Sequence, residues 1–338
     1  MTQPAPQVDL QPIWNLMTAF QHSAALKAAI EIELFTKIGE GNKTAAAIAT
    51  ATGAAERGVR ILADTLTVLG LLSKTGDEYS LTSDTAFFLD KNSQAYLGSA
   101  VEFLMGATQM RGMNDLTNAV KQGGTTVTGD GSVDPESPMW VTFARAMAPL
   151  MFPSGEAIAA NLGYPSDKKI KVLDIAAGHG MFGILVAKAY PNAEIHAVDW
   201  PNVLTVATEN AEKFGVADRH HLIPGSAFDV DFGSDYDVVL VTNFLHHFDA
   251  ETNTKFMRKV NDALSADGKA ITLEFIPNDD RVSPRAEALF PLVMLAATPA
   301  GDAYTLAELK SMFEDAGFTK NDHIALSPMP QHLVISAK

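Results

Sequence analysis

Residues 171–180 read KVLDIAAGHG and residues 193–201 read AEIHAVDWP, and the apolar segment between them has the length of a helix. The two quoted segments are short apolar runs typical of buried strands. Gly178 and Gly180 follow the first strand, and a glycine lets backbone approach a ligand where a Cβ would clash. Asp199 ends the second strand, where its carboxylate can accept hydrogen bonds from a ribose diol. The stretch therefore predicts a nucleoside-binding βαβ unit.

The charge next to the glycines helps to decide which nucleoside is bound. Residues 178–183 fit GxGxxG, and the spacing from Gly180 to Asp199 is near that of a NAD site. Asp174 lies shortly before the glycines, however, where its charge would repel a pyrophosphate. A carboxylate there suits a ligand that carries an ammonium or sulfonium group. This favours S-adenosylmethionine over a dinucleotide and disfavours a nicotinamide dehydrogenase.

The order of the expected elements from residue 166 onward is that of an α/β domain. We expect strands at 170–175, 194–199, 220–224, 236–242, 268–276, 321–326 and 331–336, and helices at 181–190, 201–214, 251–265 and 305–316. Only residues 327–330 separate the last two strands, which is too short for a parallel crossover. A mostly parallel sheet of seven strands that ends in an antiparallel hairpin is therefore expected.

The first half of the chain reads as mostly helical. Apolar positions recur at helical spacing over residues 12–38, and residues 43–90 predict two helices and a β-hairpin turned at Gly76, which is a winged-helix pattern. Residues 95–165 are helical again, apart from a Gly/Thr/Asp/Pro-rich interruption at 122–138, and are rich in Met and Phe. Such residues are either core or the wall of an adaptable apolar pocket.

Composition limits the class of protein. The chain has 338 residues, 47% of them hydrophobic, which is enough for two domains. The formal net charge of −15 argues against a nucleic-acid partner, and the absence of cysteine excludes disulfides and thiolate metal sites. We find no signal peptide and no apolar run of about 20 residues that could span a membrane. A soluble, cytoplasmic protein without a membrane partner is expected.

Taken together, these motifs resemble the class I S-adenosylmethionine-dependent O-methyltransferases that have an N-terminal winged-helix dimerisation domain, such as the caffeate, hydroxyindole and bacterial polyketide enzymes. The resemblance implies a Rossmann-like catalytic domain at residues 166–338, a dimerisation domain at 1–95 and a helical connector that lines the substrate pocket at 96–165. It also implies a homodimer that methylates a hydroxyl of a small, aromatic or polyketide-like acceptor and releases S-adenosylhomocysteine.

The resemblance also implies the cofactor residues. The family's DxGGGxG loop corresponds to residues 174–180, its DLP to residues 199–201 and its GDMF to residues 225–228, where Ser226 replaces the aspartate that accepts from the adenine amino group. Asp199 would hold the ribose hydroxyls, and Trp200 would lie on the adenine face. The full set of expected cofactor residues is Asp174, Ala176, Gly178, Gly180, Asp199, Trp200, Ser226, Ala227, Phe228, Thr242 and Asn243.

The candidate catalytic residues follow the fourth strand. The segment from Asn243 to Glu251 resembles the family's LHDWxDE motif, which places the general base at His246. His247 replaces an aspartate and is an alternative base. Glu274 comes 28 residues after His246, the spacing of the family glutamate that orients the histidine. We expect no metal at the His-His pair, because adjacent residues point apart and no third ligand is evident.

The acceptor pocket is expected to be apolar and to lack one of the two acidic residues that the family places next to the histidine. Phe143 and Met147 match the family's FxxxM pair, and Met294 and Thr298 lie in the segment that contacts the acceptor. The family's second acidic partner of the histidine falls at Ala303 in this chain. A more acidic acceptor hydroxyl, or a reaction at an atom other than oxygen, therefore stays open.

A second class of function stays open from the sequence. A winged helix fused to a nucleoside-sensing domain could be a transcription regulator, with a recognition helix near residues 55–70. That segment carries only Arg57 and Arg60 as basic residues and is otherwise strongly apolar, which suits burial at a dimer interface better than a DNA groove.

Overall fold

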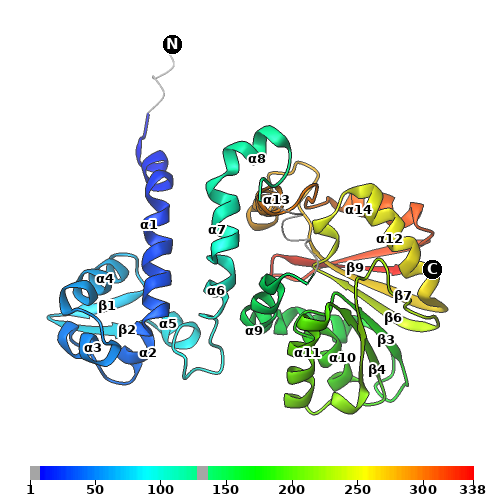
Figure 1. Cartoon of the computed structure of the whole chain (residues 1–338), viewed down its shortest axis with the longest axis horizontal. Coiled ribbons are helices and arrows are strands. Elements are labelled where there is room, and N and C mark those ends of the chain that lie inside the picture. Colours follow the sequence, from blue (N-terminus) through cyan, green and yellow to red (C-terminus); the bar gives the residue numbers. More distant parts are fainter. Residues whose placement is uncertain (1–7, 128–135) are drawn as a thin grey trace, which may run out of the picture. The chain divides into compact units, whose positions relative to one another are not determined.

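The computed structural model describes residues 8–127 and 136–338 (Figure 1). The first seven residues and part of the expected interruption at 122–138 lie outside the described residues. The internal contacts of the chain divide it into two compact units, which are Met1–Val101 and Glu102–Lys338. Each unit is described by itself.

The first unit is a small helical domain with a two-stranded sheet. Its elements are α1 (Gln11–Glu31), α2 (Leu34–Gly39), α3 (Ala45–Thr52), α4 (Glu56–Val68), β1 (Leu72–Thr75), β2 (Glu78–Leu81) and α5 (Ser83–Phe88). The Thr44 side chain caps α3 by accepting from Ala47 N, and Gly53 ends that helix with a φ of 70°. The fully buried Tyr79 of β2 donates its hydroxyl to Asp64 of α4 at 2.7 Å. The expected pair of helices followed by a hairpin is confirmed.

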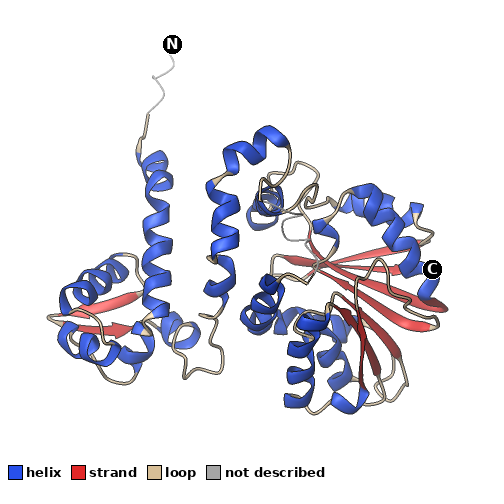
Figure 2. Ribbon diagram, in the orientation of Figure 1, coloured by secondary structure: helices blue, strands red, loops and turns tan. Residues whose placement is uncertain are grey.

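The second unit contains the remaining elements, drawn by type in Figure 2. Its helices are α6 (Ala100–Leu104), which starts at the boundary, α7 (Ala107–Asn114), α8 (Leu116–Gln122), α9 (Pro138–Asn161), α10 (Met181–Ala189), α11 (Pro201–Lys213), α12 (Ala250–Ala263), α13 (Arg285–Ala297) and α14 (Leu306–Asp315), with short 3₁₀ turns η2 (Ala217–Arg219) and η3 (Leu245–His247). Its strands are β3 (Lys171–Ile175), β4 (Glu194–Asp199), β5 (His220–Pro224), β6 (Tyr236–Thr242), β7 (Leu264–Phe275), β8 (Lys320–Ala325) and β9 (Gln331–Ala337).

These seven strands form one sheet in the order β5-β4-β3-β6-β7-β9-β8. The pairs from β5 to β7 are parallel, whereas β9 is antiparallel to both β7 and β8. The expected parallel sheet with a C-terminal antiparallel hairpin is therefore confirmed. The strand order reverses at β3, because β4 and β6 lie on either side of it, and ligands bind at such a switch point beyond the carboxyl ends of the strands.

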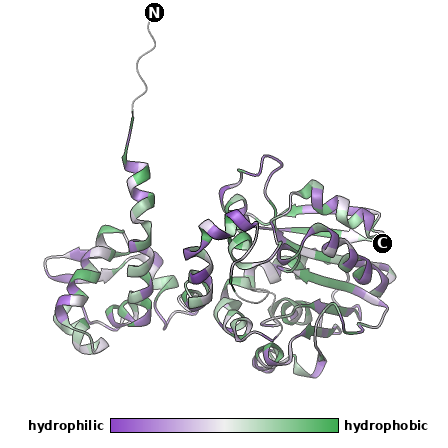
Figure 3. Cartoon of the chain, turned by 45° about the horizontal axis from the view of Figure 1, so that its top comes forward, coloured by the Kyte–Doolittle hydropathy of each residue, from purple (hydrophilic) through white to green (hydrophobic). Residues whose placement is uncertain are grey.

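Helices cover both faces of this sheet (Figure 1). Because successive side chains of a strand point to opposite faces, β6 sends Val238 and Leu240 to the core beneath α9 and α10, and Val239 and Val241 to the core beneath α12 and α14. Strands buried on both faces are mostly apolar, and Figure 3 shows the hydrophobic colour concentrated in the strands of the larger sheet. The two cores hold the carboxyl ends of β3, β4, β6 and β7 in fixed positions.

The described ranges, 8–127 and 136–338, contain no helix that is both long enough and apolar enough to cross a membrane.

Candidate active site

A cavity of about 630 Å³ lies within the second unit at the carboxyl ends of the parallel strands. Its volume is in the range of small-molecule sites. Loops after β3, β4, β5 and β6 supply one side, and helices α7, α9 and α13 supply the other. The expected site residues that line it are Ala176, Gly178, Asp199, Trp200, Ser226, Ala227, Phe228, Thr242, Asn243, His246, Phe143, Met147 and Met294.

The glycine loop after β3 brings backbone to the cavity wall. Gly178 has a φ of 57°, a conformation that favours glycine, and a Cβ placed there would meet Ala176 O at 3.8 Å and the ring of Phe143 at 3.9 Å, so no large group among the described residues fills this face of the loop. Gly180 serves packing instead, because a Cβ there would lie 3.0 Å from the Cβ of Ala207 on α11. Gly180 does not line the cavity. The two glycines therefore have different physical roles.

Asp199 joins the glycine loop to the end of β4. Its Oδ2 accepts from Gly178 N and its Oδ1 from Trp200 N, both at 2.7 Å. An ionised carboxylate has about four acceptor positions, so each oxygen can accept one more hydrogen bond from a ligand. Burial raises the pKa of Asp199 to about 6, against the lowering effect of these two backbone N–H groups.

Asp174 is placed differently from the sequence-based expectation of a direct contact with a cationic ligand. It is fully buried beneath the loop, does not line the cavity, and its Oδ2 accepts from Gly183 N at 3.0 Å in the first turn of α10. Burial raises its pKa to about 7. In the same turn, Met181 N donates to His179 Nδ1 at 3.1 Å. Asp174 and His179 thus satisfy helix N–H groups that have no partner within the helix.

A lysine fixes the loop after β5 that carries the expected adenine contacts. Lys259 of α12 donates to the carbonyl oxygens of Ala227, Phe228 and Val230 at 3.0, 2.9 and 2.7 Å. The hydroxyl of Ser226 accepts from Phe228 N at 3.2 Å and can still donate. Asp229, which the sequence analysis did not single out, also lines the cavity. A carboxylate is therefore present near the position where the family aspartate is replaced.

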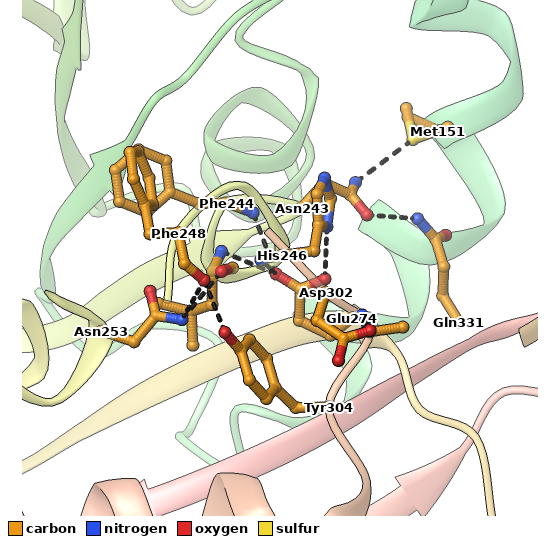
Figure 4. Close-up of polar contacts among 12 residues, drawn as sticks. Met151, Asn243, Phe244, His246, Phe248, Asn253, Glu274, Asp302, Tyr304 and Gln331 are labelled. Carbon is orange, nitrogen blue, oxygen red and sulfur yellow. Dashed lines mark hydrogen bonds and ion pairs between the residues drawn. The ribbon is translucent and has the colours of Figure 1, made fainter. Parts of the chain in front are cut away.

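The histidine and glutamate expected to act together are in contact, as Figure 4 shows. His246 Nδ1 lies 2.6 Å from Glu274 Oε2, and both side chains are buried. Glu274 Oε1 accepts from three successive backbone N–H groups, those of Phe244, Leu245 and His246, at 3.0, 2.8 and 3.4 Å. Glu274 does not line the cavity, so it reaches the site through the imidazole. The short turn η3 and the imidazole ring are consequently held by a single carboxylate.

His247 differs from His246 in its surroundings. Its ring lies 4.3 Å from the ring of His246 and 5.4 Å from that of Trp140, measured between centroids. Burial, together with the nearby His246, lowers the pKa of His247 well below the usual value. The imidazole of His247 therefore has little tendency to take up a proton at neutral pH.

The segment that holds the family's second acidic residue is used here for packing. Ala303 is buried, Asp302 forms an ion pair with Arg281 at 3.3 Å, and the Tyr304 hydroxyl donates to Phe248 O at 2.6 Å. Tyr304 therefore anchors the backbone after η3 and does not bond the imidazole of His246. Glu274 is the one carboxylate recorded in contact with that imidazole among the described residues.

Apolar side chains from two helices face the loops. Phe143 and Met147 of α9 and Met294 of α13 line the cavity as expected. Thr298 does not: it is fully buried, and its hydroxyl donates to Met294 O and accepts from Gly301 N, both at 2.8 Å. Thr298 therefore closes the turn after α13. Further lining residues that the sequence analysis did not assign to the pocket are Trp140, His179, Phe182, Phe275, Phe290 and Gln331.

The sequence held a signal for some of these residues. His179 lies inside the glycine loop, and Trp140 lies one helical turn before Phe143. Phe275 follows Glu274 directly on β7, whereas Gln331 comes from the distant strand β9 and carries no local signal. Among residues 8–127 and 136–338, no group of three or more His, Cys, Asp or Glu side chains is arranged to hold a metal ion.

Comparison with known proteins identifies the family. Residues 14–91 match the O-methyltransferase dimerisation domain, and residues 167–319 match the O-methyltransferase domain. The chain belongs to this family of methyltransferases. It is 47% identical to a solved protein of Nostoc punctiforme assigned as an O-methyltransferase, over 98% of this chain and 100% of that one, with a TM-score of 0.94.

Two further proteins show the range of the similarity. The 3-hydroxy-5-methyl-1-naphthoate 3-O-methyltransferase of Streptomyces sahachiroi is 28% identical over 90% of this chain and 88% of its own length. The human N-acetylserotonin methyltransferase, solved in complex with S-adenosylmethionine, shares the fold with a TM-score of 0.86 at 20% identity, over 100% of this chain and 99% of that one.

We predict that Gly301→Ala destabilises the protein and disturbs the site. A Cβ at Gly301 would overlap the carbonyl oxygen of His246 and lie 2.6 Å from Thr298 Oγ1, so the turn that carries the imidazole must move. The expected cost is about 1–3 kcal/mol in the free energy of unfolding, measured by urea denaturation. Gly58→Ala, inside α4 with no atom within 4 Å, is the control and should be neutral or stabilising. Equal effects of the two substitutions would contradict the prediction.

Proposed function

We propose that this protein transfers a methyl group from S-adenosylmethionine to a hydroxyl of a small aromatic or polyketide-like molecule, with His246 as the general base and Glu274 as the residue that orients it. The contact of 2.6 Å between the imidazole and the carboxylate, at the wall of a cavity that Asp199 also lines, is the observation that carries the proposal. The relative that methylates a hydroxynaphthoate supports the acceptor class.

The loops after β3, β4 and β5 fit S-adenosylmethionine, which supplies a methyl group on a sulfonium. Asp199 has acceptor positions left for the two ribose hydroxyls, and the absence of a side chain at Gly178 lets the ligand approach the backbone of the loop. The indole of Trp200 and the ring of Phe228 line the same side of the cavity and can cover the faces of the adenine. Ser226 and Asp229 can meet its polar edge.

The acceptor would lie on the other side of the cavity, against α9 and α13. Phe143, Met147, Met294 and Phe290 form an apolar wall there. Such a wall suits a planar ring and keeps water away from the hydroxyl that is to be methylated. The nucleophilic oxygen is then less solvated, and its approach to the methyl group is fixed by packing.

The imidazole of His246 is set up to remove the proton of that hydroxyl. Because Glu274 accepts from Nδ1, the neutral ring carries its proton on Nδ1 and leaves the lone pair of Nε2 for the acceptor. When Nε2 takes up the proton, the imidazolium is stabilised by the carboxylate at 2.6 Å. The lowered pKa of His247 makes that residue a poorer base and favours His246 in this role.

Ala303 removes one source of support for the imidazolium. With a single carboxylate on His246, the base is expected to be weaker than one held by two. We therefore propose that the acceptor hydroxyl is more acidic than that of a simple phenol.

The domain assignment follows from these roles. We propose that residues 1–95 form the dimerisation domain, residues 96–165 a helical connector and residues 166–338 the domain that holds the cofactor. Side chains of α7 and α9 in the cavity lining support the role of the connector in acceptor binding.

The first test is His246→Ala, which should lower kcat/KM by about 10²- to 10⁴-fold, the usual contribution of a general base. The dissociation constant of S-adenosylhomocysteine, measured by calorimetry, should change by less than about threefold, because the imidazole lies on the acceptor side. A matched substitution, Glu274→Gln, should also lower the rate, since its amide would donate to Nδ1 and leave the proton on Nε2. His221→Ala, at an exposed histidine, is the control. Equal losses of binding and rate in His246→Ala would show a structural role.

The second test is the pH dependence of cofactor binding. The pKa of Asp199 is raised to about 6, so its carboxylate is charged above that pH and protonated below it. Affinity for S-adenosylhomocysteine should be constant above about pH 7 and should fall by up to about tenfold per pH unit below pH 6, because the protonated form loses acceptor capacity. Asp199→Asn should bind weakly with a flat profile over the same range. An unchanged profile in that variant would assign the titration to another group.

The third test concerns a homodimer formed through the first unit. One stripe of α1 exposes Ile13, Leu16, Met17 and Phe20 by 59%, 77%, 65% and 68%, at the i, i+3, i+4, i+7 spacing of a single helix face. The double variant Leu16→Glu and Phe20→Glu should shift the protein toward monomers in light scattering. Gln21→Glu, on the same helix, controls for added charge. A monomeric wild type at micromolar concentration would refute the dimer.

A further inference from the structure

One amide side chain stands out in the apolar part of the cavity. Asn243 directly follows β6 and was expected, from the family resemblance, to touch the cofactor. Its side chain contacts Gln331 of β9 and Met151 of α9 (Figure 4). Strand β9 lies beyond β7 from β6, away from β4 and its Asp199 in the strand order.

A chain of hydrogen bonds orients this amide. The hydroxyl of Ser154 donates to Gln331 Oε1 at 2.7 Å, and Gln331 Nε2 donates to Asn243 Oδ1 at 2.7 Å. Ser154 and Gln331 are 0% and 5% exposed, so both side chains are fixed by burial. The backbone of Asn243 is fixed as well, with a φ of 52° and a bond from its N–H to Leu273 O at 2.8 Å.

With its oxygen held by Gln331, Asn243 keeps an N–H donor available at the cavity wall. Asn243 Oδ1 is occupied, whereas Asn243 Nδ2 has two hydrogens and one recorded contact, with Met151 Sδ at 3.8 Å. A thioether is a weak acceptor, so most of the donor capacity remains unused. The neighbouring Thr242 is 4% exposed and lines the cavity, and its hydroxyl has no partner among the described residues. Unused polar groups at a buried wall are stabilised when a ligand supplies the missing partner.

The two contacts of the amide, Met151 and Gln331, lie next to residues that we assign to the acceptor. Met151 lies one helical turn after Met147 on α9. Gln331 is paired with Phe275 in the sheet, and the ring of Phe275 stacks at 4.0 Å on Phe290, the ring that meets the His246 imidazole at 4.9 Å. The side chain that holds the Asn243 amide is thus adjacent in the sheet to Phe275, which stacks on the ring that contacts His246.

The absence of positive charge from the described cavity lining around Asn243 indicates which kind of ligand atom its N–H group can bind. No lysine or arginine is among the described residues that line the cavity. A carboxylate placed against a single neutral amide would be buried without a cation, which is costly, whereas a carbonyl oxygen needs no more than a hydrogen bond.

We propose that Asn243 selects acceptors that carry a ketone or quinone oxygen on the ring system that bears the reactive hydroxyl, with Asn243 Nδ2 donating to that oxygen and Gln331 and Ser154 acting as positioning residues. This inference rests on the proposed function, since it names the acceptor class of the same site. A carbonyl conjugated to the hydroxyl also makes it more acidic, in agreement with a base held by one carboxylate.

The test compares two rings that differ in one carbonyl group, 6-hydroxy-1-tetralone and 5,6,7,8-tetrahydro-2-naphthol. Binding of each to the protein saturated with S-adenosylhomocysteine is measured by calorimetry, which requires no turnover. The wild type should bind the tetralone at least about tenfold more tightly, the value of one good hydrogen bond. Asn243→Asp should abolish this preference, because the aspartate keeps the size, tolerates the positive φ and still accepts from Gln331, but places an oxygen where the donor was.

Two further variants complete the design. Ser154→Ala frees Gln331 and should reduce the preference by a smaller factor, whereas Asn92→Asp, which adds the same charge at an exposed position, should leave it unchanged. A preference that persists in Asn243→Asp, or a wild type that binds neither ring or both equally, would overturn the inference. Methyl transfer is assayed separately. If the protein methylates an acceptor but Asn243→Asp does not change the binding preference, the inference is refuted and the proposed function stands. If Asn243→Asp removes the preference but the protein methylates no acceptor, the proposed function is refuted and the binding inference stands.

Discussion

The site depends on one buried carboxylate, that of Glu274. Its Oε1 receives three consecutive backbone N–H groups after β6, and its Oε2 receives His246 Nδ1. Without these bonds the donors of a sharp turn would be buried without partners, at about 1–3 kcal/mol each. The same bonds fix which nitrogen of the imidazole carries the proton. The Glu274 side chain can bond both the turn and the imidazole because its strand, β7, is paired with β6, so that the end of β7 is held next to the turn that follows β6.

Around the glycine loop, too, buried side chains bond backbone N–H groups. Asp199 binds two backbone N–H groups and has acceptor positions left, while Asp174 and His179 satisfy N–H groups in the first turn of α10. The carboxylate nearest the glycines in sequence, Asp174, is thus a buried support, and Asp199 at the end of β4 lines the cavity. Burial disfavours the charged form of Asp174 and raises its pKa to about 7, and the N–H group of Gly183 in the first turn of α10 offsets only part of this effect.

Two features of the site, at Ala303 and at Asn243, bear on the choice of acceptor. Ala303 leaves His246 with one carboxylate, and the segment around it is held by Arg281 and Tyr304 instead. We propose that both features favour one kind of acceptor: a base with one carboxylate partner suits a more acidic hydroxyl, and the N–H donor of Asn243 suits the electron-withdrawing carbonyl that produces such acidity.

Local signals in the sequence were enough to predict three features. Strand periodicity predicted the sheet, a short connection predicted its terminal hairpin, and motif spacing predicted the contact of His246 with Glu274. It also indicated the Met- and Phe-rich wall. Tertiary contacts, which left no local signal, keep Asp174 and Thr298 out of the cavity lining, bring Gln331 into it, and bond the Asn243 side chain to Gln331. These outcomes depend on how distant strands and helices meet, and the direction of a side chain at a strand end is set by contacts that lie far away in the sequence.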